Sequence, residues 1–74
     1  MEATEAETIQ ITVNGESKTV PHGLTVAQLL ACLEIKPDRV AVELNRSIVR
    51  KQDWDAVVVG QGAEIEIVWF VGGG

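Results

Sequence analysis

A single amphipathic helix lies between segments that alternate like strands, and this pattern constrains the fold most. Thr25 can cap the helix, and Gln28, three residues later, completes a capping box. We expect the helix to end near Glu34, because Pro37 forbids its continuation. Apolar residues recur at helical spacing on one side, at Val26, Leu29, Leu30 and Leu33. A lone helix with one apolar stripe must pack on a sheet.

The segments around the helix supply the strands. Apolar and polar residues alternate over residues 8–13, and Asn14-Gly15 is a strong hairpin signal. Further strands are predicted at residues 17–20, 40–44, 48–49 and 63–71. The order of hairpin, helix and later strands is that of the β-grasp, or ubiquitin-like, fold. We therefore predict the α+β class, with one helix packed on a mixed sheet of four or five strands.

The last predicted strand has an unusual outer face. Ile65 and Ile67 point toward the core, and strict alternation puts Trp69 and Val71 on the same side. The outer face then carries Glu64, Glu66, Val68 and Phe70. Apolar residues beside carboxylates suit a protein-docking surface, and we predict that role for these four. The alternatives are a solvated acidic face and a Phe70 that the twist of the sheet partly buries.

Length and charge bound the organisation and the partners of the chain. Its 74 residues suffice for one small domain. We expect a disordered acidic leader at residues 1–7, a β-grasp domain at 8–71 and a flexible glycine tail at 72–74. The net charge of −5 argues against nucleic acid and anionic membranes, and it favours a protein partner with a basic face. No apolar run is long enough to span a membrane.

Few side chains could perform chemistry. His22 is the only histidine and lies between Pro21 and Gly23, which is typical of a turn. Cys32 is the only cysteine, and we expect it to act as a small, partly buried apolar residue of the helix. Together they cannot form a zinc site or a disulfide, and a reducing cytoplasm is favoured. We expect Trp54 to anchor its loop by packing.

Three glycines follow Val71 and close the sequence. Because glycine has no Cβ, such a segment can enter a channel too narrow for other residues. It also leaves the carboxylate of Gly74 unobstructed. We predict that Gly74 is the reactive residue and that Gly72 and Gly73 form the arm that threads into partner active sites. The alternative is a frayed chain end.

Several of these segments together resemble one known family. Residues 45–54 and 64–68, the glycine-ended residues 70–74 and the helix opening at residues 23–30 are similar to ThiS, the sulfur carrier of thiamine biosynthesis. The resemblance covers nearly all of the chain. A terminal Gly-Gly alone is shared by many ubiquitin-like proteins, so the ordered combination of segments carries the resemblance.

The resemblance implies a carrier on which partner enzymes act, with no enzymatic activity of its own. A ThiF-type adenylyltransferase, related to ubiquitin-activating enzymes, would use ATP and Mg²⁺ to join Gly74 to AMP. A cysteine desulfurase or another sulfurtransferase would supply sulfur and leave a thiocarboxylate at Gly74. A ThiG-type thiazole synthase would then take that sulfur. No cofactor or metal would be bound by this chain, and the free carrier would be a monomer.

Other functions also fit the sequence. The small subunit of molybdopterin synthase is a β-grasp sulfur carrier that also ends in Gly-Gly. A modifier joined to lysines of other proteins would use the same activated terminus. A passive interaction module of the same fold would not need Gly74 at all.

Overall fold

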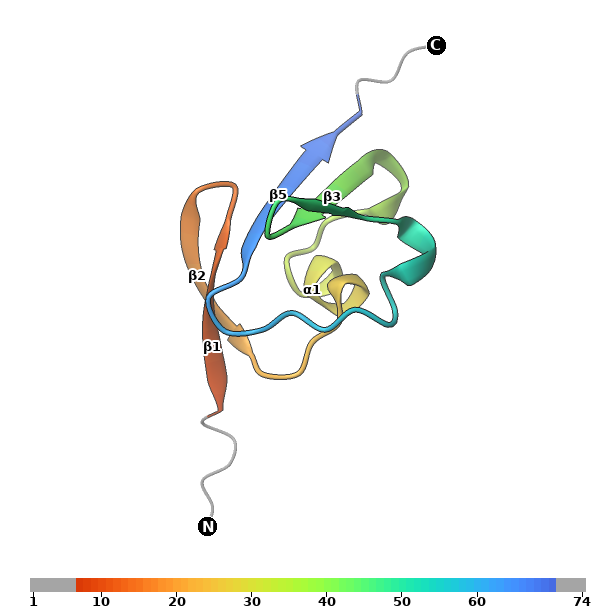
Figure 1. The fold of residues 1–74 in the computed structure, drawn as a ribbon. Helices are drawn as coiled ribbons and strands as arrows, with labels where there is room; N and C mark the ends of the chain where they lie inside the picture. The colour runs from red at the N-terminus through yellow and green to blue at the C-terminus, as the bar shows by residue number, and fades with distance from the viewer. Residues whose placement is uncertain (1–6, 71–74) are drawn as a thin grey trace.

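The structure, a computed structural model, describes residues 7–70 of the 74. Five strands form one sheet, and a single α-helix covers one of its faces (Figure 1). This arrangement confirms the prediction of one helix on a mixed sheet. The elements are β1 (Thr8–Val13), β2 (Glu16–Pro21), α1 (Val26–Cys32), the 3₁₀ turn η2 (Pro37–Arg39), β3 (Val40–Leu44), β4 (Ser47–Val49), the 3₁₀ turn η3 (Lys51–Asp53) and β5 (Glu64–Trp69).

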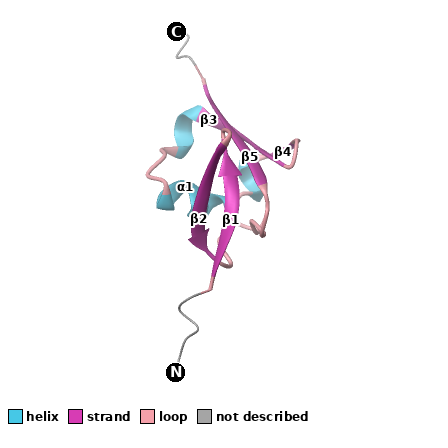
Figure 2. Ribbon diagram, turned by 90° about the vertical axis from the view of Figure 1, so that its left-hand side faces the viewer, coloured by secondary structure: helices cyan, strands magenta, loops and turns pink. Residues whose placement is uncertain are grey.

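The strand order β2-β1-β5-β3-β4 places the last strand at the centre of the sheet. β5 pairs in parallel with β1, as at Thr12 opposite Glu64, and antiparallel with β3, as at Val42 opposite Ile67. The β1–β2 and β3–β4 pairs are antiparallel hairpins at the two sides (Figure 2). The strand that leads to the glycine segment is therefore held from both sides.

The first hairpin turns as its sequence predicts. Asn14 and Gly15 have φ values of 50° and 84°, the left-handed conformation that a two-residue hairpin turn requires. β2 begins at Glu16 and includes Pro21, so it is longer than the predicted strand at 17–20. Pro21 is tolerated because β2 is an edge strand, where a missing N–H need not break a ladder.

The start of α1 has the predicted capping box. The Gln28 N–H donates to Thr25 Oγ1 at 3.2 Å, and the Thr25 N–H donates to Gln28 Oε1 at 3.0 Å. The next free N–H groups, of Val26 and Ala27, donate to carbonyls of the loop before β5, at Val57 and Trp54. These bonds attach the first turn of the helix to that loop, so the helix start is fixed in both direction and position.

α1 ends close to the predicted position, near Glu34, but for a different reason. The last helical residue is Cys32, Leu33 is the C-cap, and the following residues form a Schellman motif before Pro37 is reached. The Glu34 N–H donates to the Ala31 carbonyl, the Ile35 N–H donates to the Leu30 carbonyl, and Glu34 has a φ of 60°. Glycine usually occupies that position, so the sequence did not reveal this motif.

The core lies between α1 and the sheet. It consists of apolar side chains from the helix, from alternate positions of β1, β3 and β5, from one position of β2 and from the connecting loops: Ile9, Ile11, Val13, Val20, Val26, Leu29, Leu30, Val40, Val42, Trp54, Val59, Ala63, Ile65 and Ile67. Trp54 is the packing anchor that the sequence predicts, and its Nε1–H donates to the Val49 carbonyl at 2.9 Å. Within residues 7–70, the helices are too short to cross a membrane.

Candidate functional site

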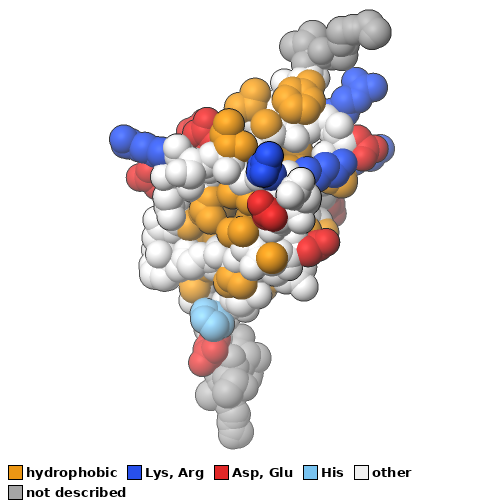
Figure 3. Space-filling model, turned by 45° about the vertical axis from the view of Figure 1, so that its right-hand side comes forward, with side chains coloured by type: hydrophobic (Ala, Val, Ile, Leu, Met, Phe, Trp, Pro, Cys, Tyr) orange, Lys and Arg blue, Asp and Glu red, His pale blue; other side chains and the backbone are white. Residues whose placement is uncertain are grey.

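The four residues predicted for docking lie along β5 and just after it, on the face away from α1. Glu64 and Glu66 are exposed, and Val68 and Phe70 expose 52% and 57% of their surface. The Phe70 N–H donates to the Arg39 carbonyl at 2.8 Å, so Phe70 continues the pairing with the β3 side. The structure thus gives these residues one shared surface, and apolar side chains gather where the described chain ends (Figure 3).

Strict alternation of inward and outward side chains along β5 predicts a buried Trp69, and the structure differs. Trp69 follows Ile65 and Ile67 on the helix side of the sheet, but 52% of its surface is exposed. β5 extends past the end of α1 in both ribbon views, so α1 does not cover the sheet at this level (Figures 1 and 2). The prediction that Trp69 faces the core is therefore wrong. Three large apolar side chains in a row, Val68 to Phe70, are about half exposed on alternating sides.

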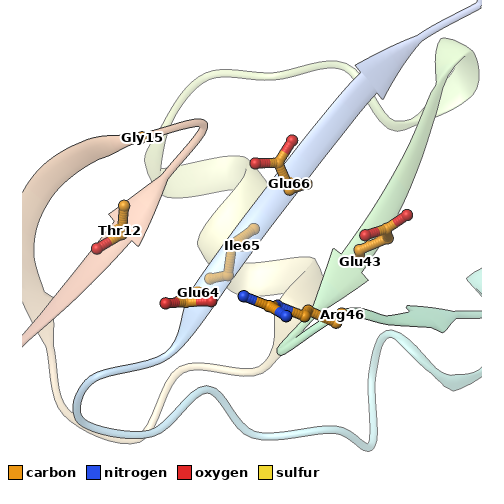
Figure 4. A pocket seen from close by; sticks show the side chains of 7 residues that line it. All are labelled: Thr12, Gly15, Glu43, Arg46, Glu64, Ile65 and Glu66. Carbon is orange, nitrogen blue, oxygen red and sulfur yellow. The ribbon is translucent and has the colours of Figure 1, made fainter.

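A depression of about 420 Å³ lies on the outer face of the sheet, where Glu64 and Glu66 of β5 line it. Glu43 of β3 stands directly opposite Glu66 of β5, and Glu64 lies two residues from Glu66 on the same face (Figure 4). Like charges directly opposite each other destabilise a sheet. Three carboxylates at one depression therefore favour a positively charged partner at this face.

The β3–β4 turn supplies the one basic side chain at this depression. Asn45 and Arg46 have φ values of 52° and 73°, again a turn with two left-handed residues. The Glu64 N–H donates to Asn45 Oδ1 at 2.9 Å, and the Asn45 N–H donates to the Glu64 carbonyl at 2.7 Å. These bonds fix the turn against β5, and Arg46 extends from it toward Glu64 (Figure 4).

Asn14 is a further residue that sequence reasoning missed. Its Nδ2 donates to the Ile67 carbonyl at 3.1 Å, and its Oδ1 accepts from the Ile67 N–H at 2.7 Å. The side chain thereby bonds β5 as another strand residue would, one step beyond the last backbone pair of β1. Sequence identified Asn14 only as a turn residue, because its partner lies 53 positions away.

The remaining predicted residues either lie outside the described range or are exposed on the surface. Val71, Gly72, Gly73 and Gly74 lie outside the described residues, and so does most of the leader at residues 1–7. His22 is exposed in a turn, as expected, whereas Cys32 is exposed on α1 instead of partly buried. Among residues 7–70, His, Cys, Asp and Glu side chains form no group of three that could hold a metal ion.

Comparison with known proteins identifies the family. The model of the ThiS family matches residues 6–74. The chain belongs to the ThiS family. The crystal structure of the thiamine biosynthesis protein ThiS from Geobacter metallireducens matches with a TM-score of 0.80 and 36% identity, covering 89% of this chain and all of that one. A solution structure from the same organism gives a TM-score of 0.74 at 36% identity, covering 89% and 88%. The resemblance to the ThiS sulfur carriers and the β-grasp fold are thus confirmed.

Two relatives are larger proteins. A thiazole synthase of Magnetococcus marinus is 39% identical over 66 residues, which cover 89% of this chain but 20% of that protein. A thiazole synthase of Paramagnetospirillum magneticum gives the same values. The chain thus spans about a fifth of their length. An uncharacterised protein, ycf40, of Porphyra purpurea is 29% identical over 89% of this chain and 93% of its own.

Proposed function

We propose that this ThiS-family chain carries sulfur, as a thiocarboxylate on Gly74, for formation of the thiazole ring of thiamine. The observation that carries the proposal is the match to the ThiS family through residue 74, on a fold whose central strand leads into the glycine segment. β5 ends at Trp69, so only a few residues separate a rigid sheet from the proposed reactive group. The proposal includes a free carboxylate at Gly74.

The first step activates that carboxylate. A carboxylate is a poor electrophile, because oxide would have to leave. In the proposed step, a carboxylate oxygen of Gly74 attacks the α-phosphorus of ATP. The bond to the β-phosphate oxygen breaks, and pyrophosphate leaves. ATP and Mg²⁺ belong to a ThiF-type partner in this scheme. The product is an acyl adenylate, whose AMP is a good leaving group.

The second step introduces sulfur. The terminal sulfur of a persulfide, held by a cysteine desulfurase or another sulfurtransferase, attacks the Gly74 carbonyl carbon and displaces AMP. A thiol then cleaves the sulfur–sulfur bond of this acyl disulfide. The thiol is oxidised to a disulfide, and the carrier is released as a thiocarboxylate. That sulfur is nucleophilic, and a ThiG-type thiazole synthase would take it for the ring.

The carrier's own contribution is recognition. Val68 and Phe70 provide apolar contact area beside the glycine segment, and Glu64 and Glu66 provide negative charge for a basic partner face. Gly72 and Gly73 would thread into each active site in turn. The thiazole synthase relatives support this pairing, since a segment similar to this domain lies within proteins of that name. We place these reactions in the cytoplasm, with the free carrier a monomer.

The test is intact mass after incubation of the chain with a ThiF-type enzyme, ATP and a persulfide donor. We expect a mass gain equal to one oxygen exchanged for one sulfur, confined to the C-terminal peptide. The matched control is the same chain made with a carboxamide at Gly74, which preserves the length and cannot be adenylated. An unchanged mass in the carboxylate form, with an active enzyme present, would refute the proposal.

The same experiment separates the other candidates. Sulfur transfer onward to thiazole synthase supports the thiamine pathway, whereas transfer only to a molybdopterin synthase large subunit would indicate the other carrier. Attachment of Gly74 to lysines in a cell extract would indicate a protein modifier. A chain lacking Gly74 that keeps full activity would indicate a passive module. The family match favours thiamine among these.

A further inference from the structure

The backbone of β5 changes its environment at Trp69. The Thr12 and Asn14 N–H groups donate to the carbonyls of Ala63 and Ile65, so the backbone N–H and carbonyl groups of the odd-numbered β5 residues point toward β1. The backbone groups of the even-numbered residues point toward β3, as the bond from the Phe70 N–H to the Arg39 carbonyl shows. By this alternation the N–H and the carbonyl of Trp69 point to the β1 side.

β1 does not reach Trp69. Its backbone pairs with β5 end at Val13 opposite Ile65, and the Asn14 side chain bonds both backbone groups of Ile67. Trp69 lies opposite Val40, but the bonds to the β3 side run through the even-numbered residues of β5, so no described residue bonds the Trp69 N–H. β5 also extends past the turn of the β1–β2 hairpin in Figure 1. β5 is therefore a central strand up to Ile67 and an edge strand at Trp69.

We propose that the activating partner adds an extended segment to this short edge, pairing with the N–H and carbonyl of Trp69. The proposal rests on the proposed function, since it names how that partner holds the same end of the chain. Main-chain pairing at an exposed edge is a common mode of peptide recognition. Here it would use the last described strand residue before the glycine segment.

The surroundings of the edge define the chemistry of the added segment. On the helix side it meets Trp69, whose surface is 52% exposed and suits an apolar residue. On the outer side it meets Val68 and Phe70, the chain neighbours of Trp69, which expose 52% and 57% of their surface. The segment is thus apolar toward both faces of the sheet. A basic surface around it on the partner would complement the net charge of −5 of this chain.

A second copy of this chain is a poorer occupant. Each copy carries a net charge of −5, and pairing two such edges would bring two acidic surfaces together.

Pairing with a partner also has a geometric consequence. Gly74 is five positions after Trp69 in the sequence, so the reactive carboxyl group would lie within about 18 Å of the paired residue, the reach of a fully extended chain.

The direct test is hydrogen exchange of single amides by NMR, for the free carrier and for its complex with the activating enzyme. In the free carrier the Trp69 amide should exchange rapidly, and in the complex at least about tenfold more slowly. The amide of Val68 is the internal control, because it faces β3, opposite Ala41, in both states. Protection at Trp69 that is equal in both states would overturn the proposal.

A backbone substitution separates pairing from side-chain contact. Because Cys32 is the only cysteine, the chain can be assembled by ligation at that position with N-methyl-Trp69, which keeps the indole and removes the donor. The affinity for the activating enzyme should fall about tenfold. N-methyl-Val58 is the matched control, since Val58 is 57% exposed and its N–H makes no hydrogen bond with the described residues.

The outcomes distinguish the two proposals. Normal adenylation of Gly74 with unchanged affinity of the N-methyl-Trp69 chain would overturn strand addition and leave the sulfur-carrier proposal intact. A complex that protects Trp69 but never adenylates Gly74 would refute the sulfur-carrier proposal. Protection of Trp69 that depends on carrier concentration alone would assign the edge to a second copy and overturn the partner assignment.

Discussion

The two bonds from Asn14 to Ile67 predict a specific pattern of stability. Asn14→Gly keeps the left-handed turn available, because glycine adopts the φ of 50° without strain, and it removes only the side-chain amide. Asn45→Gly is the matched control. It has nearly the same φ, 52°, in the other two-residue turn, and its side chain accepts one bond, from the Glu64 N–H.

The magnitudes follow from the bond counts. A typical intramolecular hydrogen bond contributes about 1 kcal/mol net, so Asn14→Gly should lower the free energy of unfolding by about 2 kcal/mol and Asn45→Gly by about 1 kcal/mol. For a domain of this size, about 2 kcal/mol corresponds to a fall in Tm of roughly 8–16 °C. Asn14→Ala should cost about 1 kcal/mol more than Asn14→Gly, since alanine is strained in the left-handed region.

The assay is urea unfolding followed by circular dichroism, with the slope of the transition compared among variants. If the slope is unchanged, a shift of the urea midpoint reports a change in the free energy of unfolding. If Asn14→Gly destabilises the domain no more than Asn45→Gly does, the bonds to Ile67 contribute nothing beyond an ordinary turn. The argument for Asn14 as a substitute strand residue would then be refuted.

Three further predictions concern the surface and the helix end. Phe70→Ala should weaken binding to the activating enzyme roughly tenfold without changing the urea midpoint. Val58→Ala, at a residue with the same 57% exposure, should not weaken binding. Equal effects of the two substitutions in a binding titration would remove Phe70 from the proposed docking surface. Glu34→Gly should leave stability unchanged or raise it by up to about 1 kcal/mol, because it relieves the φ of 60°, and a clear loss in urea unfolding would contradict that account. Glu43→Gln should stabilise the domain by about 0.2–1 kcal/mol by removing repulsion with Glu66, and the gain should shrink in high salt; a gain independent of salt would point to another cause.

Local signals explain most of what the sequence predicted correctly. The capping box at Thr25 and Gln28 and the turn at Asn14-Gly15 need only neighbouring residues, and both form as predicted. The position of the helix end was predicted, but its Schellman motif was not, because Glu34 adopts a conformation that usually requires glycine. Sequence statistics assign little weight to such an exception, although the surrounding bonds from Glu34 and Ile35 hold it in place.

Features that depend on the register between strands could not be predicted from the sequence. Glu43 faces Glu66 only because β3 pairs antiparallel with β5 in one particular register. Alternation placed Trp69 on the correct side of the sheet, but its exposure depends on where the helix stops covering the sheet. The shared face of the four residues proposed for docking could be predicted because their period-two pattern is local to β5. Arg46 could not, because it reaches Glu64 and Glu66 from the turn between two other strands.

The parallel pairing of β1 with β5 also governs how the domain is made. The first and the last strand pair across 52 positions, since Thr12 lies opposite Glu64 (64 − 12 = 52), and the last strand fills the middle of the sheet. Such distant contacts slow folding, and a two-stranded hairpin alone is only marginally stable in water. The core can therefore close only after β5 has docked. Under the proposed function, an enzyme that recognises β5 only in its docked form would activate folded chains and leave unfolded chains without sulfur.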